Sequence, residues 1–266
     1  MKNIYLILII LSSLTFSQGF NPFQKSSSTF RSIENNAFDY GEQLFYDVGY
    51  GFITAGEGHF KVMAKPKILN GRNTYDIRFA VKSLSSLRWL YRVHDRYQTF
   101  VDEQGIFPWQ YEQHIKEGGY RRDVKTFFNQ EKNFAVTGKD TTQIPEYVHD
   151  VVSALYYLRT MDLSEVKNDS IIEFNQFFND STYVLGIKII KREIIEVDAG
   201  EFHTILIEPL VVEGGLFKSE GSIKVWITDD EKKIPVKVGT KVLIGFVGAE
   251  LRDYKGIKGK INAKID

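Results

Sequence analysis

Hydrophobic and polar residues alternate along much of this chain with a period of two, which is typical of β-strands. The first clear case is residues 44–50, where Leu44, Tyr46, Val48 and Tyr50 fill every second position. Further segments of this kind are separated by turn-forming residues at 70–71, 118–119, 198–200 and 229–233. Because tight turns join antiparallel neighbours, the pattern predicts an antiparallel sheet rather than parallel strands linked by helices.

Two segments have the spacing of a helix. Residues 150–159 begin with Asp150, a residue type that caps helix N-termini, and place Leu155 and Leu158 on one apolar face that we expect to pack on the sheet. Residues 83–91 form a weaker case, with leucines at intervals near three. The predicted fold is therefore mainly β: a single domain built as a curved antiparallel sheet or open β-barrel with one or two short helices.

An apolar run near the N-terminus has the features of a signal peptide. Lys2 precedes residues 4–11, which are almost all apolar but fewer than the ~20 that cross a bilayer. Thr15 and Ser17 supply the small residues that favour cleavage after Ser17. This predicts a signal peptide over 1–17, export to the periplasm, and a mature chain without a transmembrane span. The alternatives are a retained anchor or a buried N-terminal helix.

The rest of the chain divides by composition. Residues 18–39 are rich in Ser, Asn and Gln and predict a flexible leader. No linker interrupts residues 40–254, which predicts one β domain, and the Gly- and Lys-rich residues 255–266 predict a frayed tail. Within the domain, residues 100–108 resemble residues 226–235: each reads as a strand, an acidic turn, a proline and a strand. Two ordinary hairpins or a sheet of two related halves would both explain this resemblance.

Composition excludes several classes of chemistry. The chain has 34 Lys+Arg and 34 Asp+Glu, so its formal net charge of +0 argues against a nucleic-acid partner and against a polybasic membrane-surface protein. It has no cysteine, which excludes disulfides, thiolate metal sites and a cysteine nucleophile. Its histidines are too dispersed for a metal-binding motif, and no phosphate-binding loop or catalytic serine motif is present. We therefore predict no metal, no cofactor and no catalytic residue.

Asp95 is expected to form a structural ion pair. On a strand it lies in phase with Val93 and Tyr97, and a buried carboxylate without a partner is costly. The conceivable partners are Arg88, Arg92 and Arg159. The acidic pairs at 102–103 and 229–230 are read as solvated turn formers, with dispersed catalytic carboxylates as the alternative.

Aromatic residues are abundant, with 20 Phe, 14 Tyr and 3 Trp. Trp89, Tyr91, Tyr156 and Tyr157 are the candidates for an apolar ligand site, because two flank Leu90 and two lie on the predicted helix. Simple core packing is the alternative for all four.

Several segments together resemble an exported bacterial family of unknown function, the domain of unknown function 3108. The segments lie at 41–56, 93–95, 150–159, 226–230 and 234–236, so the resemblance covers nearly the whole mature chain. It implies an exported, mostly β protein without an assigned activity. The hairpin at 226–236 is also similar to one in periplasmic lipoprotein carriers, which implies an incomplete β-barrel closed by helices around an apolar cavity.

These observations favour a non-enzymatic periplasmic protein that binds a lipid or other apolar ligand, or an envelope protein. The alternatives are an envelope hydrolase that uses dispersed carboxylates, and a purely structural interaction protein. An apolar cavity walled by aromatic residues would favour the first. Convergent ionisable groups in a cleft would favour the second, and an exposed apolar patch alone would favour the third.

Overall fold

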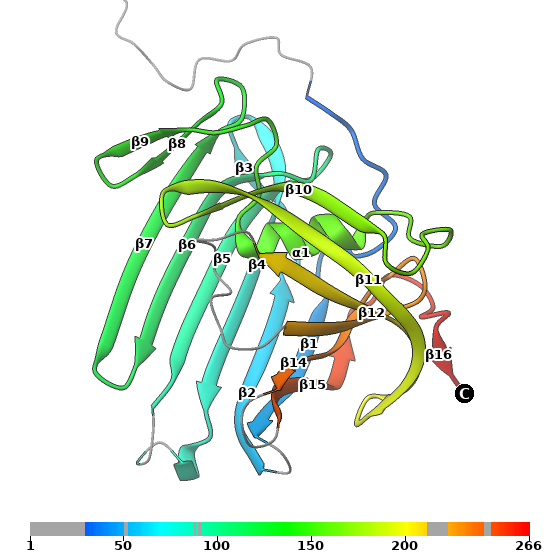
Figure 1. Ribbon diagram of the computed structural model, residues 1–266. Coiled ribbons are helices and arrows are strands. Elements are labelled where there is room, and N and C mark those ends of the chain that lie inside the picture. Colours follow the sequence, from blue (N-terminus) through cyan, green and yellow to red (C-terminus); the bar gives the residue numbers. More distant parts are fainter. Residues whose placement is uncertain (1–29, 51–52, 88, 90–91, 212–222, 242–245) are drawn as a thin grey trace, which may run out of the picture.

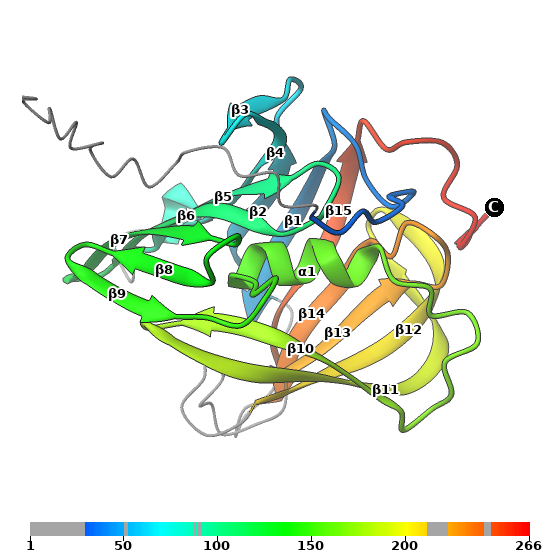
Figure 2. The ribbon, with the colours of Figure 1, turned by 90° about the horizontal axis from the view of Figure 1, so that it is seen from above.

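The computed structural model describes residues 30–50, 53–87, 89, 92–211, 223–241 and 246–266. These residues form one 16-stranded antiparallel sheet, with α1 (Val151–Arg159) on its concave side (Figures 1 and 2). This confirms the prediction of a curved antiparallel sheet or open barrel. No helix in the described ranges is long and apolar enough to cross a membrane.

The sheet is built from hairpins that follow one another along the chain. On one side of β1 (Gln43–Tyr50) the strands are β2 (Ile53–Val62), β3 (Lys67–Leu69), β4 (Arg72–Ser83), β5 (His94–Asp102), β6 (Pro108–Glu117), β7 (Tyr120–Asn129), β8 (Phe134–Thr137) and β9 (Asp140–Gln143). On the other side are β10 (Ile171–Phe178), β11 (Ser181–Val197), β12 (Gly200–Val211), β13 (Ile223–Thr228), β14 (Pro235–Lys241), β15 (Phe246–Lys255) and β16 (Lys264–Ile265).

Pairing of β1 with β15 joins these two sets of strands. The hydrogen-bonded order is β10-β11-β12-β13-β14-β15-β1-β2-β4-β5-β6-β7-β8-β9, with β3 beside β4 and β16 beside β12. The sheet curves until its outer strands approach each other. There, Arg122 Nη2 donates to Asn179 Oδ1 at 2.6 Å and Thr142 Oγ1 donates to the Asp180 carbonyl at 3.3 Å. α1 lies between the two sets of strands (Figure 2).

The predicted turns lie where the sequence places them. Asn70 and Gly71 join β3 to β4, both with positive φ (50° and 73°), as a two-residue hairpin turn requires. The pairs Glu117↔Tyr120 and Val197↔Gly200 close two further predicted hairpins. Before the turn at Asn70 and Gly71, the chain forms two strands, because β2 ends at Val62 and β3 begins at Lys67.

The two similar hairpins, β5–β6 and β13–β14, also share backbone geometry. Each has a register shift just before its turn, so that Val101 pairs with Pro108 and Ile227 with Pro235. Each has a residue with positive φ two positions before the proline, Ile106 (47°) and Lys233 (43°). The resemblance between the two sequences therefore extends to the same bulged hairpin, once in each set of strands.

α1 begins as predicted. Asp150 Oδ1 accepts hydrogen bonds from the Val152 and Ser153 backbone amides at 2.8 and 2.9 Å. Its other oxygen accepts one from Thr99 Oγ1 of β5 at 2.6 Å, so the cap also fixes the helix to the sheet. Burial raises the pKa of Asp150. For the second expected helix, at 83–91, the described residues contain a short 3-10 turn at Ser85–Leu87, and residues 88, 90 and 91 lie outside them.

The C-terminal end of α1 is held by a buried ion pair. Arg159 and Glu42 have relative exposures of 1% and 0%, and the guanidinium donates to both carboxylate oxygens at 2.6 and 2.8 Å. Arg159 Nε also donates to the Lys232 carbonyl at 3.0 Å. Burial alone would lower the pKa of Arg159, but the charge of Glu42 raises it above its usual value.

Residues 30–39, expected within a flexible leader, instead pack on the domain. Phe38 is fully buried and meets Tyr75 and Tyr156 edge-on, at ring-centroid distances of 5.0 and 4.7 Å. The Ile33 amide donates to the Gln104 carbonyl, and the Asn36 carbonyl accepts from Lys232 Nζ. This part of the segment packs on the domain because it buries an aromatic ring and forms hydrogen bonds with the β5–β6 and β13–β14 turns.

The C-terminal tail, expected to fray, is also packed. Ile261 and Ala263 are buried, and β16 pairs with β12. Asp230 Oδ2 accepts a hydrogen bond from the Ala263 amide at 3.0 Å. The prediction was wrong because it rested on the many Gly and Lys residues of this segment, whereas a few apolar residues are sufficient to anchor it.

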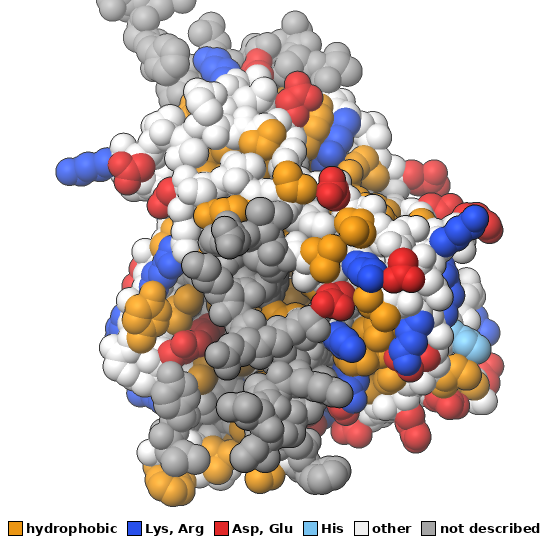
Figure 3. Space-filling model, viewed as in Figure 1, with side chains coloured by type: hydrophobic (Ala, Val, Ile, Leu, Met, Phe, Trp, Pro, Cys, Tyr) orange, Lys and Arg blue, Asp and Glu red, His pale blue; other side chains and the backbone are white. Residues whose placement is uncertain are grey.

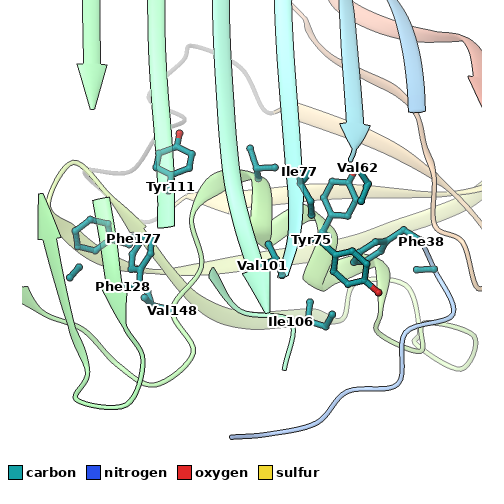
Figure 4. Packing of buried hydrophobic residues seen from close by; sticks show 14 of the residues in the cluster. Phe38, Val62, Tyr75, Ile77, Val101, Ile106, Tyr111, Phe128, Val148 and Phe177 are labelled. Atoms are coloured by element: carbon teal, nitrogen blue, oxygen red, sulfur yellow. The ribbon is translucent and has the colours of Figure 1, made fainter. Parts of the chain in front are cut away.

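Buried hydrophobic residues pack between α1 and the strands. The face of the molecule shown in Figure 3 carries both acidic and basic side chains. Figure 4 shows one cluster, in which Phe38 lies beside Tyr75, and Phe128 beside Phe177. The curved sheet surrounds this core on both sides, and α1 covers the concave face of the sheet (Figure 2).

The Glu42–Arg159 pair yields a stability prediction. Glu42→Gln leaves a buried guanidinium without its counter-charge, so we expect the free energy of unfolding to fall by about 3–5 kcal/mol in chemical denaturation. Glu250→Gln is the control, because Glu250 pairs with Lys237 at the surface, and it should cost less than about 1 kcal/mol. Equal losses in the two variants would contradict a dominant role for the buried pair.

Candidate functional site

An apolar cavity lies between α1 and the concave face of the sheet. Its volume is about 410 Å³. Its wall contains residues of α1 and of both sets of strands: Tyr46, Val48, Gly58, Phe60, Phe79, Val81, Tyr97, Tyr111, Gln113, Val151, Val152, Leu155, Pro209, Ile223, Val225, Pro235, Val238 and Ala249. No charged side chain occurs among these described residues.

Aromatic rings form one wall of this cavity. Phe60 of β2 lies directly opposite Phe79 of β4, which lies opposite Tyr97 of β5, because the strand registers align them. The rings stack with centroid distances of 4.1 and 5.8 Å. Tyr46 meets Phe60 edge-on at 6.0 Å. Such a row presents a continuous apolar surface along the sheet.

The polar atoms of the wall are few. The Tyr46 hydroxyl donates to the Pro235 carbonyl at 2.7 Å, which joins β1 to β14. Burial raises the pKa values of Tyr46, Tyr97 and Tyr111, so these phenols stay neutral at physiological pH. The amide of Gln113 partly offsets this effect at Tyr97. The wall can thus offer neutral hydrogen-bonding groups near Gln113 and an apolar surface elsewhere.

α1 presents Val151 and Leu155 to this cavity. The sequence predicts that Leu155 packs against the sheet, but in the structure it is half-buried and lines the cavity, whereas Leu158 is buried in the core. Polar contacts hold the two ends of the helix, and Val151, Val152 and Leu155 between them line the cavity.

The structure describes three of the four candidate ligand-binding residues, and none of these three belongs to the described wall of the cavity. Trp89 is exposed and Tyr91 lies outside the described residues. Tyr156 is buried in the core, where its hydroxyl donates to Glu42 at 3.4 Å. Tyr157 stacks on His149 at 4.5 Å. Their role in ligand binding stays a prediction. The aromatic wall consists instead of strand residues. Alternation in the sequence predicts that such residues lie on the buried face of the sheet, but it does not show which strands are neighbours.

The buried His149 forms a cluster with the half-buried Arg31 and Tyr157. Arg31 Nη2 donates to His149 Nε2 at 3.3 Å, and its guanidinium lies over the rings of Tyr147 and Tyr157 at 4.3 and 4.6 Å. Arg31 also donates to the Gly105 and Ile106 carbonyls. Burial and the nearby arginine hold the pKa of His149 well below its usual value, so the ring is neutral.

The acidic residues of the turns are used for structure. Asp102 is buried and accepts hydrogen bonds from Arg72 Nη2 and the Gly105 amide at 2.8 Å, so it is not the solvated turn former that we expected. Asp230 accepts from Thr228 Oγ1 at 2.8 Å and from the Lys232 amide at 3.0 Å. A polar hollow of about 500 Å³ lies beside this second turn. In the described part of the chain, no group of three or more acidic or histidine side chains is placed to hold a metal.

Asp95 is buried, as its phase on the strand predicts. Its Oδ1 accepts a hydrogen bond from the Lys116 amide at 2.9 Å. Burial and the neighbouring Asp95 carboxylate raise the pKa of Glu117. Of the three expected partners, Arg159 pairs with Glu42, Arg92 is exposed, and Arg88 lies outside the described residues. The ion pair of Asp95 therefore stays a prediction, with Arg88 as its candidate partner.

The sequence matches the family described as "Protein of unknown function (DUF3108)" over residues 46–252. Among solved structures, it is similar to a β-barrel-like protein of the domain of unknown function DUF1849 from Brucella abortus. The TM-score is 0.51 at 10% identity, over 86% of this chain and 100% of that chain. A hypothetical protein from Chlamydia trachomatis gives a TM-score of 0.36 at 6% identity, over 85% of this chain and 92% of that chain. The comparison with curated proteins finds no match. The first of these likenesses shows the fold alone.

The neutral His149 yields a prediction of pH dependence. Its folded-state pKa lies below that of the unfolded chain, so protonation favours unfolding, and stability is lost as pH falls below about 6.5. We expect unfolding free energies of the wild type to fall relative to those of His149→Gln by up to about 1.4 kcal/mol per pH unit there. Removal of the exposed His203 in His203→Gln is the control. A difference between wild type and His149→Gln that does not change with pH would contradict the buried neutral state.

The predicted Asp95–Arg88 pair can be tested by a double-mutant cycle. Asp95→Asn, Arg88→Gln and the double variant should give a coupling energy of at least about 1 kcal/mol in chemical denaturation if the pair is buried. Asp95→Asn should also lower the pKa of Glu117, because it removes a neighbouring negative charge. A coupling energy near zero would assign the cost of Asp95→Asn to the Lys116 amide contact instead.

Proposed function

This chain belongs to the DUF3108 family of proteins of unknown function, and from the geometry of its cavity we propose that it binds a small apolar ligand between α1 and the curved sheet. The observation that carries this proposal is the cavity wall, which combines the aromatic row of β1, β2, β4 and β5 with aliphatic residues of β12–β15. A volume of about 410 Å³ falls within the ~300–1,000 Å³ that is common for ligand sites.

The composition of the wall supports an apolar class of ligand. Its described residues carry no charge, so an ion or a sugar would lose its hydration without gaining charged partners. An apolar molecule would instead gain the contacts that an empty apolar cavity lacks. A lipid acyl chain, with a polar group near Gln113 and Tyr97, satisfies both conditions.

The setting of this activity is part of the proposal. The short apolar run at 4–11 and the small residues before position 18 support cleavage of a signal peptide over 1–17 and a periplasmic location. A carrier or sensor of apolar molecules would meet its ligands in that compartment, between two membranes. A protein partner from the envelope would receive or report the ligand.

The hydrolase alternative has less support. Asp102 and Asp230, the carboxylates that would have to act, are each committed to several hydrogen bonds in their turns. Neither belongs to the described wall of the apolar cavity. A hydrolase needs a nucleophile, acid or base beside its substrate.

The test uses matched substitutions on the two faces of β4. Val81 lines the cavity opposite Gly58, whereas Ala80 lies on the other face in a row with His59 and Arg96. Val81→Phe should fill part of the cavity and weaken the binding of the fluorescent apolar probe N-phenyl-1-naphthylamine by about ten-fold or more, a loss of ~1.4 kcal/mol. Ala80→Phe should bind the probe like the wild type.

Native mass spectrometry of the protein from an envelope fraction, followed by lipid extraction, would identify the natural ligand. We expect an adduct that is present in the wild type and in Ala80→Phe but depleted in Val81→Phe. If the wild type does not bind the probe, or if both variants bind it equally well, the cavity is not a ligand site.

A further inference from the structure

Exposed apolar residues gather at one end of the strands. Trp89, between β4 and β5, is 81% exposed, Ile53 at the start of β2 is 63%, Tyr120 at the start of β7 is 54%, and Val247 near the start of β15 is 40%. All four lie at the same end of the sheet, because the β1–β2, β4–β5, β6–β7 and β14–β15 connections share it. We call these four residues the apolar rim. It is the lower end of β2, β6 and β7 in Figure 1.

The apolar rim is continuous with the cavity. Ile223, at the start of β13, lines the cavity, and Val247 of β15 is two residues from Ala249, which also lines it. Residues two positions apart on a strand share a face. The concave apolar surface therefore extends to the rim at the end opposite α1.

Basic residues accompany the apolar rim. Arg92 is exposed, and its carbonyl accepts a hydrogen bond from the Gly118 amide, so it lies beside the β6–β7 turn. Lys116 and Arg121 pair across that same hairpin. Within the part of the chain that the structure describes, the side chains of Arg92, Lys116 and Arg121 form no ion pair. Arg92 and Arg121 are exposed, as is the neighbouring Tyr120. The nearby Glu117 has a raised pKa and lies one residue from Lys116.

We propose that the apolar rim docks on the surface of an anionic phospholipid bilayer. Trp and Tyr are the side chains that favour the boundary between lipid tails and water, and neighbouring Arg and Lys favour anionic headgroups. Both are present at this end, next to an apolar surface that leads into the cavity. The docking surface is argued from the rim alone. Its use as the route by which a lipid enters the cavity rests on the proposed function.

The experiment measures binding to vesicles of phosphatidylglycerol and phosphatidylcholine, with the protein and all variants purified in their exported form. Trp89→Ser/Tyr120→Ser should lower the partition coefficient by about ten-fold or more, because it removes the aromatic contacts with the interface. Arg92→Gln/Lys116→Gln/Arg121→Gln should lower it by about five-fold for each charge removed. Added salt should weaken binding of the wild type but have much less effect on the neutralised variant.

Ile68→Ser is the matched control. Ile68 is 69% exposed on β3, at the opposite end of the sheet, so its loss should leave vesicle binding unchanged. If the wild type does not bind the vesicles, or if Ile68→Ser loses as much binding as the rim variants, the proposal is wrong. A concentration-dependent dimer that Trp89→Ser abolishes would overturn it as well, because the rim would then bind a second copy of the chain.

The proposal of membrane docking and the proposal of ligand binding in the cavity can be tested separately. Val81→Phe should keep vesicle binding while it loses N-phenyl-1-naphthylamine, and the rim variants should show the reverse. If Val81→Phe loses the probe and the rim variants keep it, but neither the wild type nor any variant binds vesicles, the cavity remains a ligand site and the rim is not its contact with lipid. Vesicle binding without probe binding would leave the rim as a docking surface and remove the cavity from the function.

Discussion

The buried pair of Glu42 and Arg159 is the contact on which the arrangement of this protein depends. A guanidinium and a carboxylate without water are stable only together, so the last residue of α1 and the residue before β1 must meet at one position. Asp150 and Thr99 play the corresponding part at the other end of the helix. α1 is thus fixed at both ends by polar contacts that tolerate little displacement, and the apolar side chains between them need not all reach the sheet.

The same contacts connect the two sets of strands. Arg159 donates to the Lys232 carbonyl in the β13–β14 turn, while Arg31 donates to the Gly105 and Ile106 carbonyls in the β5–β6 turn. Residues 30–39 run between these positions and bury Phe38 against Tyr75 and Tyr156. Two hairpins with the same bulge are therefore each bound by an arginine from outside the sheet, and one short segment holds both.

Carboxylates that stabilise the fold lie outside the described wall of the cavity. The buried carboxylates Glu42 and Asp102 and the half-buried Asp230 hold the helix end and two turns. The described wall of the cavity has only neutral groups. In the proposed function, such a site would select its ligand by shape and hydration rather than by ionic contacts. The proposed docking of the exposed aromatic and basic residues at the opposite end from α1 would add an orientation toward a lipid surface.

By itself, the sequence determined the antiparallel strands, the positions of their turns, the capped helix and, through the lack of cysteine, the absence of thiol chemistry. These depend on neighbours along the chain: alternation in 44–50, the positive φ of Asn70-Gly71, the N-cap Asp150. Only the tertiary structure decided that Phe60, Phe79 and Tyr97 form one wall, because alternation assigns a face but not the adjacent strand. It also decided that Arg159 pairs with Glu42, since residues 117 positions apart meet only when the sheet curves. Segments 30–39 and 255–266 were misjudged for the same reason: their few apolar residues are buried by partners distant in sequence.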